Sequence, residues 1–305
     1  MTTLIFGHKS PDTDSTGSPL IWEWFLTHQG SDARAVLLGE PNTEAAFVLE
    51  RWGLGKPEII SDVSAEQSCV IVDTNNPAEL PDNINAADVR AIIDHHKLVG
   101  GLETAGPIDI TIRPLACTAT IMHDLMGDHA AHMPDSIKGA MLSCILSDTL
   151  EFRSPTTTDT DRALAESLAT DLGIDIASYA AEMFAAKSDV SAFSEAELLR
   201  MDSKEYEVDG ITFRVSVLET TSPKMVLDRK AELMAAMPTV AGEDKVNEVL
   251  LFVVDILNEE ATMLIPNDLS KRVAQASFGA TVEGDTVVLP GIMSRKKQII
   301  PNLKV

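Results

Sequence analysis

Short apolar runs that alternate with helical segments restrict the fold of this chain more than any other feature. Three of these runs, residues 4–6, 69–72 and 89–93, are nearly continuously apolar instead of alternating with polar residues, and Arg90 is the one charged residue among them. Such strands are typical of a parallel sheet covered on both faces, with helices as the crossover connections. The pattern predicts an α/β fold whose N-terminal part is a doubly wound, mainly parallel sheet.

Segments with apolar residues at helical spacing separate the apolar runs. We expect helices over residues 19–28, 43–52, 118–126, 136–146, 161–172 and 174–187, and short strands at 35–38 and 59–60.

The pattern changes near Ser188, where small polar residues interrupt the helical spacing. We therefore predict an N-terminal domain over residues 1–188, a linker at 189–193 and a smaller, mixed α+β domain over 194–305. In that domain the sequence predicts a hairpin over residues 204–208 and 211–218, helices over 223–237 and 269–276, and strands over 249–257 and 262–265.

The composition excludes several classes of function. A net charge of −23 argues against nonspecific binding to nucleic acid or to anionic membranes. No apolar run approaches the roughly 18 residues that a membrane span needs, and we expect a cytoplasmic protein with no membrane partner. Cys69, Cys117 and Cys144 lack the spacing of metal fingers or redox pairs, so we expect small buried side chains.

Acidic and imidazole residues follow each of the three apolar runs. Because the carboxyl ends of parallel strands meet at one edge of a sheet, we expect these side chains to converge in one crevice. Asp148, at the end of the predicted helix over 136–146, adds a further carboxylate. The candidate metal ligands are His8, Asp12, Asp14, Asp73, His95 and Asp148.

Two imidazoles and four carboxylates are enough for two divalent ions if one carboxylate bridges them. The four negative charges would then balance the charges of the two ions, which makes the cluster tolerable in a dry cleft. Mixed nitrogen and oxygen donors without thiolate favour Mn²⁺, Co²⁺, Fe²⁺ or Zn²⁺ over Ca²⁺, and the many carboxylates favour Mn²⁺ or Mg²⁺. The imidazoles favour Mn²⁺ of these two.

Five motifs spread over essentially the whole chain carry a family resemblance. They are residues 7–14, Val72-Asp73, Asp94-His95-His96, Ser147-Asp148-Thr149 and residues 294–298 with the sequence Ser-Arg-Lys-Lys-Gln. Together they resemble the family II, manganese-dependent inorganic pyrophosphatases of the DHH phosphoesterase superfamily. The first three motifs are shared across that superfamily, and the basic C-terminal run is specific to the pyrophosphatase branch.

The resemblance implies a role for each motif residue. One Mn²⁺ would be held by the residues His8, Asp12 and Asp73, and a second by Asp14, Asp73, His95 and Asp148, with Asp73 as the bridge. Asp94 would support the site, and the substrate phosphates would be bound by His96, Lys204, Arg295 and Lys296. Co²⁺ or Mg²⁺ would be substitutes, and further Mg²⁺ or Mn²⁺ would accompany the substrate.

The resemblance also implies the reaction, which is hydrolysis of pyrophosphate to two phosphates by a bridging water or hydroxide that two metals activate. It implies a homodimer as well. Since the basic residues lie beyond the linker, the C-terminal domain is expected to close over the metals. One departure is Thr74, which follows Asp73 where many members of the family have a histidine.

Two alternatives remain open. Within the superfamily, a phosphodiesterase or exopolyphosphatase would use the same metals, but those directed at nucleic acid usually carry a Gly-Gly-His type motif in the C-terminal domain, and this sequence has none. A metal- or phosphate-sensing protein without catalysis is the alternative from another class, and it would bind metal without turnover.

Overall fold

Two structural units make up the chain in the computed structural model, which describes residues 2–305. The division falls between Lys187 and Ser188, next to the linker that the sequence predicts at residues 189–193. Each unit has its own sheet and its own apolar core.

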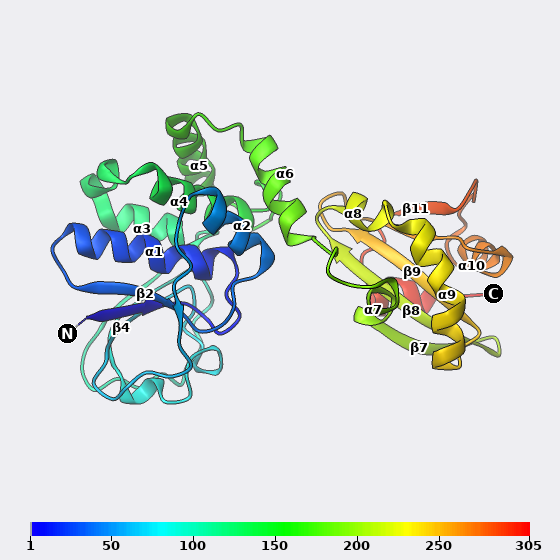
Figure 1. The fold of residues 1–305 in the computed structure, drawn as a ribbon, viewed down its shortest axis with the longest axis horizontal. Coiled ribbons are helices and arrows are strands. Elements are labelled where there is room, and N and C mark those ends of the chain that lie inside the picture. Colours follow the sequence, from blue (N-terminus) through cyan, green and yellow to red (C-terminus); the bar gives the residue numbers. More distant parts are fainter. Residues whose placement is uncertain (1) are drawn as a thin grey trace. The chain divides into compact units, whose positions relative to one another are not determined.

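The first unit is built on a six-stranded parallel sheet with the order β3-β2-β1-β4-β5-β6 (Figure 1). The strands are β1 Thr3–Phe6, β2 Ala33–Leu37, β3 Glu58–Ile59, β4 Ser68–Val72, β5 Asp88–Asp94 and β6 Asp109–Ile112. The predicted α/β class is confirmed. The sequence analysis missed β6, an exposed edge strand with only two apolar residues. The order reverses between β1 and β4, and doubly wound sheets bind ligands at that position.

Helices cover one face of this sheet, on which Figure 1 shows α1, α3 and α4 together. The helices of this unit are α1 Thr13–His28, α2 Thr43–Arg51, α3 Thr118–Met126, α4 Asp135–Asp148, α5 Asp159–Leu172 and α6 Ile176–Lys187, with a 3-10 helix, η3, at Gly127–His132. On the opposite face, Leu80 and Ile84 pack with Phe6 and Ile71. They belong to the segment that holds the 3-10 helices η1 (Pro77–Glu79) and η2 (Ile84–Ala86), so the connection from β4 to β5 covers this face with short 3-10 helices.

Helix α1 begins at Thr13, earlier than the predicted start at Pro19. The cap explains the difference, because a carboxylate oxygen of Asp12 accepts a hydrogen bond from the backbone N–H of Ser15 at 3.0 Å. Pro19 therefore lies inside the helix and does not open it, and it leaves one backbone carbonyl without its usual donor. The early start places Asp14 in the first turn of the helix.

The second unit contains a five-stranded mixed sheet with the order β11-β10-β9-β8-β7, in which β8 and β9 are parallel and the other pairs antiparallel. Its elements are α7 Glu195–Met201, β7 Ser203–Val208, β8 Ile211–Thr220, α8 Pro223–Leu227, α9 Lys230–Asp244, β9 Glu248–Asp255, β10 Glu260–Leu264, α10 Asp268–Phe278, β11 Thr286–Pro290, the π-helical turn η4 Arg295–Ile299 and the 3-10 helix η5 Ile300–Asn302. The mixed α+β prediction is confirmed. The single helix predicted over 223–237 is instead two helices, and β11 was not predicted.

Apolar side chains are buried inside the two units. Cys69, Cys117 and Cys144 are all buried and free, which confirms their prediction as small core residues. Among residues 2–305, none of the helices has the length and hydropathy to cross a lipid bilayer.

Close packing between α2 and α4 depends on a glycine. Gly139 of α4 lies under the indole ring of Trp52, and a Cβ atom at position 139 would come within 2.0 Å of that ring. The ring is held in place because its Nε1 donates to the hydroxyl of Tyr179 at 2.7 Å and to Oγ of Ser143 at 3.2 Å.

We expect Gly139→Ala to lower the free energy of unfolding by about 1–3 kcal/mol, because the methyl group forces the indole to move. Gly242→Ala in α9 is the matched control, since nothing lies within 4 Å of a Cβ atom there. The control should be neutral or stabilising by up to about 1 kcal/mol, as expected for alanine in a helix. Urea denaturation followed by circular dichroism measures both, and equal effects would contradict the packing argument.

Candidate metal centre

The predicted ligands of the first unit meet at the carboxyl ends of β1, β4 and β5. His8 follows β1, Asp73 follows β4, and His95 and His96 follow β5. Asp73 has a positive φ of 58°, an uncommon backbone conformation for a residue other than glycine. Its backbone N–H donates to the carbonyl of Ile93 at 2.9 Å, which ties the end of β4 to β5.

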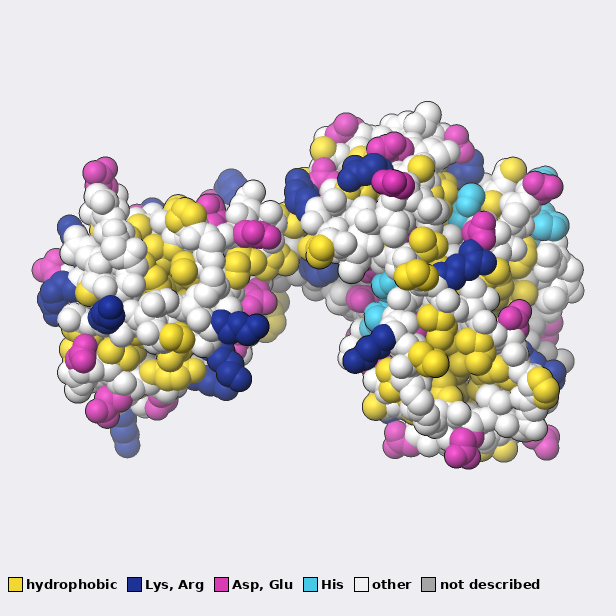
Figure 2. Space-filling model, turned by 180° about the vertical axis from the view of Figure 1, so that it is seen from behind, with side chains coloured by type: hydrophobic (Ala, Val, Ile, Leu, Met, Phe, Trp, Pro, Cys, Tyr) yellow, Lys and Arg dark blue, Asp and Glu magenta, His cyan; other side chains and the backbone are white. Residues whose placement is uncertain are grey.

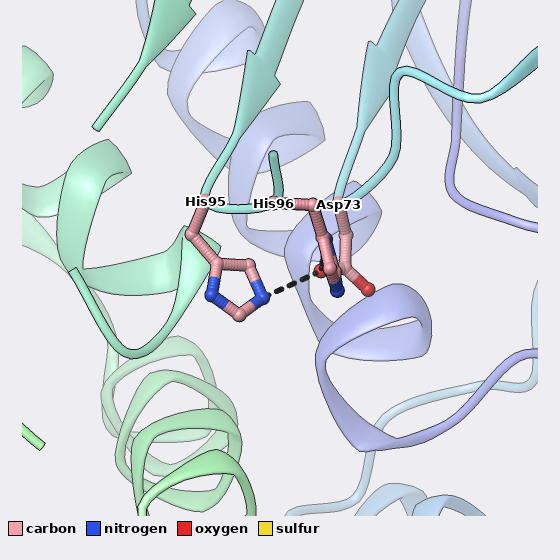
Figure 3. Close-up of side chains that lie close together, drawn as sticks. All are labelled: Asp73, His95 and His96. Carbon is pink, nitrogen blue, oxygen red and sulfur yellow. Dashed lines mark ion pairs between the residues drawn. The ribbon is translucent and has the colours of Figure 1, made fainter. Parts of the chain in front are cut away.

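Asp73 is the centre of this group (Figure 3) and is only 1% exposed. Its Oδ2 lies 3.6 Å from Nε2 of His8, and its Oδ1 lies 3.4 Å from Nε2 of His95. His96 is also close, with Nδ1 at 3.8 Å from Oδ1. The two oxygens of one carboxylate therefore face two different imidazoles.

The loop between β1 and α1 fixes His8 and Asp12. Oγ of Ser15 accepts a hydrogen bond from the backbone N–H of His8 at 2.8 Å. A Cβ atom at Gly7 would lie 1.9 Å from the same Oγ, so only glycine leaves room for this contact. Asp12 lies 3.8 Å from His8, and His8, Asp12 and Asp73 have ligand atoms close enough to hold one ion.

Asp14 and Asp148 form a neighbouring group with Cys117. Oδ1 of Asp14 accepts from Oγ of Ser18 at 2.6 Å, and its Oδ2 accepts from the backbone N–H of Thr118 at 2.8 Å. Oδ2 of Asp148 is buried and has no hydrogen-bond partner among the described residues. Burial raises the pKa of the Cys117 thiol well above its usual range, so this side chain is a poor ligand.

Burial and crowding disfavour ionisation in this cluster. The pKa of Asp73 is raised well above its usual range by burial first, and then by the charges of Asp14, Asp12, Asp148 and Asp94. The pKa of Asp148 is raised by burial and by Asp14 and Asp12. A divalent cation removes both penalties, and the unpartnered oxygen of Asp148 offers it a ligand. The donor set, imidazole and carboxylate, fits Mn²⁺.

Asp94 supports His96 and lies fully buried behind it. Oδ1 of Asp94 accepts from the backbone N–H of His96 at 3.0 Å and pairs with its Nδ1 at 2.9 Å. Burial would raise the pKa of Asp94, but hydrogen bonds from His96 and Asn75 lower it overall. The hydrogen bond to Asp94 raises the pKa of His96 in return, which favours a cationic imidazole beside the metal ligands.

Thr74, the position that departs from the family pattern, points its hydroxyl to a different partner. Its Oγ1 donates to Oε2 of Glu79 at 2.6 Å. The next residue, Asn75, donates to Oδ2 of Asp94 at 2.5 Å and accepts from the backbone N–H of Val99 at 2.6 Å. Thr74 thus holds the loop after β4, while Asn75 orients Asp94.

Three residues at this centre were not predicted from the sequence. Thr118 begins α3, and its Oγ1 donates to Oδ1 of Asp73 at 3.3 Å in addition to its backbone contact with Asp14. Lys9 and Lys97 line a cavity of about 530 Å³ that His8 and His96 also border. Lys9 and Lys97 could have been found from the sequence, because each directly follows one of the predicted histidines, His8 and His96. Cations at these positions would favour an anionic ligand.

The predicted phosphate-binding residues of the second unit lie on β7 and η4. Nη1 of Arg295 donates to the backbone carbonyl of Asp202 at 2.7 Å, and its Nη2 donates to Oδ1 of Asp202 at 2.7 Å. Lys204, two residues further along, and Lys296 are exposed. Figure 2 shows basic and acidic side chains interspersed over the surface of this unit, and histidine side chains reaching the surface of the first one.

Two family models match most of the chain. The DHH family, N-terminal domain, matches residues 2–147, and the DHHA2 domain matches residues 181–305. A protein of Deinococcus radiodurans named as a probable manganese-dependent inorganic pyrophosphatase is 41% identical over 98% of this chain and 97% of its own length. A protein of Shouchella clausii with the same name is 36% identical over 99% of this chain and 96% of its own length.

A solved structure extends the similarity to the fold. The crystal structure of a Methanococcus jannaschii protein assigned to the family II inorganic pyrophosphatases matches with 32% identity and a TM-score of 0.62, and covers 99% of this chain and 98% of that one. The two matched domains and these full-length relatives agree, and the chain belongs to the DHH family as a manganese-dependent, family II inorganic pyrophosphatase.

Proposed function

We propose that the centre hydrolyses pyrophosphate to two phosphates with two Mn²⁺ ions that share Asp73. The observation that carries this proposal is the placement of its carboxylate, whose Oδ2 faces His8 at 3.6 Å and whose Oδ1 faces His95 at 3.4 Å. One oxygen is then available for each ion. His8 and Asp12 would complete the first position, and Asp14, His95 and Asp148 the second.

Two divalent ions bound there would lower the pKa of an attacking water molecule and stabilise the charge that develops on phosphate. The chain itself supplies the orientation. Asp94 fixes the ring of His96 through Nδ1 at 2.9 Å, which leaves Nε2 for the substrate. We assign to His96 the binding of a phosphate oxygen and the donation of a proton to the leaving phosphate.

The second part of the proposal concerns the basic residues of the C-terminal unit. Asp202 holds the guanidinium of Arg295 by two contacts of 2.7 Å, which leaves its other N–H groups for a phosphate. Lys204 and Lys296 are exposed and would add point charges. Further Mg²⁺ or Mn²⁺ that arrives with pyrophosphate would complete the neutralisation of its charge, and Co²⁺ or Mg²⁺ would replace Mn²⁺ in the protein.

The quaternary state and the location are proposals from the family resemblance. We propose a homodimer formed at an edge of the six-stranded sheet. The edge strand β6 supports this, because its Ile110 is 53% exposed, and an exposed strand edge is a template for pairing. We also propose that the protein acts in the cytoplasm, where biosynthetic reactions release pyrophosphate.

The reaction is tested by measuring phosphate release from pyrophosphate after chelator-stripped protein is reloaded with Mn²⁺ or with Mg²⁺. We expect rapid release that is fastest with Mn²⁺, because imidazole ligands favour it over Mg²⁺. A phosphodiester and an inorganic polyphosphate are assayed in parallel. Cleavage of either of these without pyrophosphate turnover would move the protein to the phosphodiesterase or exopolyphosphatase branch.

Two variants separate metal binding from substrate binding. Asp73→Ala should weaken Mn²⁺ binding at both positions by at least about 100-fold, since even residues behind the ligands contribute 10–100-fold. Arg295→Ala should keep both ions and lower kcat/KM by about 10²–10³, the loss expected for one donor to the developing charge. Calorimetric titration with Mn²⁺ and steady-state kinetics measure these effects. Equal loss of metal in both variants would contradict the division of roles.

The metal-free protein should lose stability as the pH rises. The folded state raises the pKa of Asp73 and of Asp148, so their contribution to stability is complete below the unfolded value of about 3.9 and is lost as the pH passes through the folded values. The thermal midpoint of chelator-stripped protein should therefore decrease as the pH is raised above about 4.

Bound Mn²⁺ should reverse this trend, because it neutralises the ionised cluster. At about 100 times its Kd, one ion adds about 2.7 kcal/mol to the free energy of unfolding. The gain in midpoint on adding Mn²⁺ should be larger at the higher pH, and Asp148→Asn should reduce the difference. Scanning calorimetry measures the midpoints, and a gain that is independent of pH would contradict the charge argument.

A further inference from the structure

Glu44 is a buried carboxylate that belongs to neither proposed metal position. It lies in the first turn of α2 and is 0% exposed. Its Oε1 accepts a hydrogen bond from Oγ1 of Thr13 at 2.7 Å. Its Oε2 lies 3.3 Å from Nζ of Lys187 and has no hydrogen-bond partner among the described residues. A buried carboxylate is costly unless it is paired. Thr13 and Lys187 are the partners of this one, and their positions indicate what the pairing does.

Thr13 connects Glu44 to the metal centre. It stands between Asp12 and Asp14, the residues proposed as ligands of two different ions, and is 1% exposed. Its side chain is held by Glu44, and its backbone carbonyl accepts a weak hydrogen bond from Sγ of Cys144 at 3.4 Å. Both the side chain and the backbone between the two ligands are therefore fixed.

Lys187 connects the same network to the end of the first unit. It is the last residue of α6, and the chain passes from there into the second unit. Its side chain is 38% exposed and supplies the cation that the buried Glu44 faces. The three side chains thus join the loop that carries two ligands to the residue at which the chain leaves this unit.

We propose that Thr13, Glu44 and Lys187 are positioning residues that hold the Asp12–Asp14 turn in the geometry that binds both ions, and that Lys187 links this geometry to the start of the linker. The inference rests on the proposed function. Glu44 acts through Thr13, and Lys187 acts by keeping the carboxylate of Glu44 oriented. None of the three is proposed to touch metal or substrate.

The positive charge of Lys187 allows this proposal to be distinguished from a purely electrostatic effect of Lys187 on the affinity for cations. Removal of a positive charge near a cation site strengthens cation binding if charge alone matters. If Lys187 positions the turn, its removal leaves Glu44 misplaced, and cation binding weakens. The variant Lys187→Met therefore shifts affinity in opposite directions under the two explanations.

We would titrate metal-free wild type, Thr13→Val, Lys187→Met, Glu44→Gln and Glu44→Gln/Lys187→Met with Mn²⁺ in a calorimeter. We expect Thr13→Val and Lys187→Met each to weaken binding about 10-fold, as for other residues that orient ligands. The effect of Lys187→Met should shrink in the Glu44→Gln background, because the two side chains act as a pair. Lys138→Met is the matched control, since Lys138 pairs with Asp171 at 2.7 Å elsewhere in this unit.

Tighter or unchanged binding by Lys187→Met, with Thr13→Val like the wild type, would overturn the inference. Thermal unfolding of each metal-free variant shows whether it is folded, and the partly exposed Lys187 keeps the test available if Thr13→Val does not fold. Pyrophosphate turnover by the wild type is measured separately. Protein that binds Mn²⁺ with these shifts but leaves pyrophosphate intact would refute the proposed function and leave the positioning inference in place.

Discussion

Mutual repulsion among buried carboxylates is the constraint on which the metal centre depends. Asp73 is nearly inaccessible to solvent, and the charges of Asp14, Asp12 and Asp148 act on it together with the burial itself to disfavour ionisation. Such a cluster is unfavourable unless cations neutralise it. The surrounding structure provides oriented donors that reduce the cost, including the backbone N–H of Thr118 to Asp14 and that of Ser15 to Asp12.

Small residues around the first loop make this concentration of charge sterically possible. Gly7 leaves room for Ser15 to hold the backbone of His8, where a Cβ atom would lie 1.9 Å from its Oγ. Thr13, Asp14, Ser15 and Thr16, in the first turn of α1, are all buried. The polar start of this helix is therefore packed inside the unit, and its capping residue Asp12 is at the same time a proposed ligand. Asp12 therefore has two roles, as the N-cap of α1 and as a proposed metal ligand.

The proposed centre depends on residues that orient the candidate ligands and His96, as well as on the candidate ligands themselves. Asn75 orients Asp94, and Asp94 in turn fixes the ring of His96. The hydroxyl of Thr74 is directed to Glu79, so Asp94 is held by Asn75 and His96 and not by the residue that departs from the family pattern. Glu44 holds Thr13 in a similar way, because its Oε1 accepts a hydrogen bond from Oγ1 of Thr13. Supporting residues of this kind tune metal affinity without touching the metal.

The sequence alone determined the class of the fold and the convergence of the ligands. Nearly continuous apolar runs are typical of a buried parallel sheet, and parallel strands bring their carboxyl ends to one edge, so the residues that follow β1, β4 and β5 were expected to lie near one another. It could not show that helix α1 starts at Thr13, since the start depends on the Asp12 cap, or that β6 extends the sheet, since an edge strand needs few apolar residues. Only the tertiary structure decided that the two oxygens of Asp73 face His8 and His95, that Thr118 donates to Asp73, and that Glu44 pairs with Lys187. The physical reason is that these contacts join residues far apart in the chain, and their geometry follows from side-chain packing, which leaves no periodic signal in the sequence.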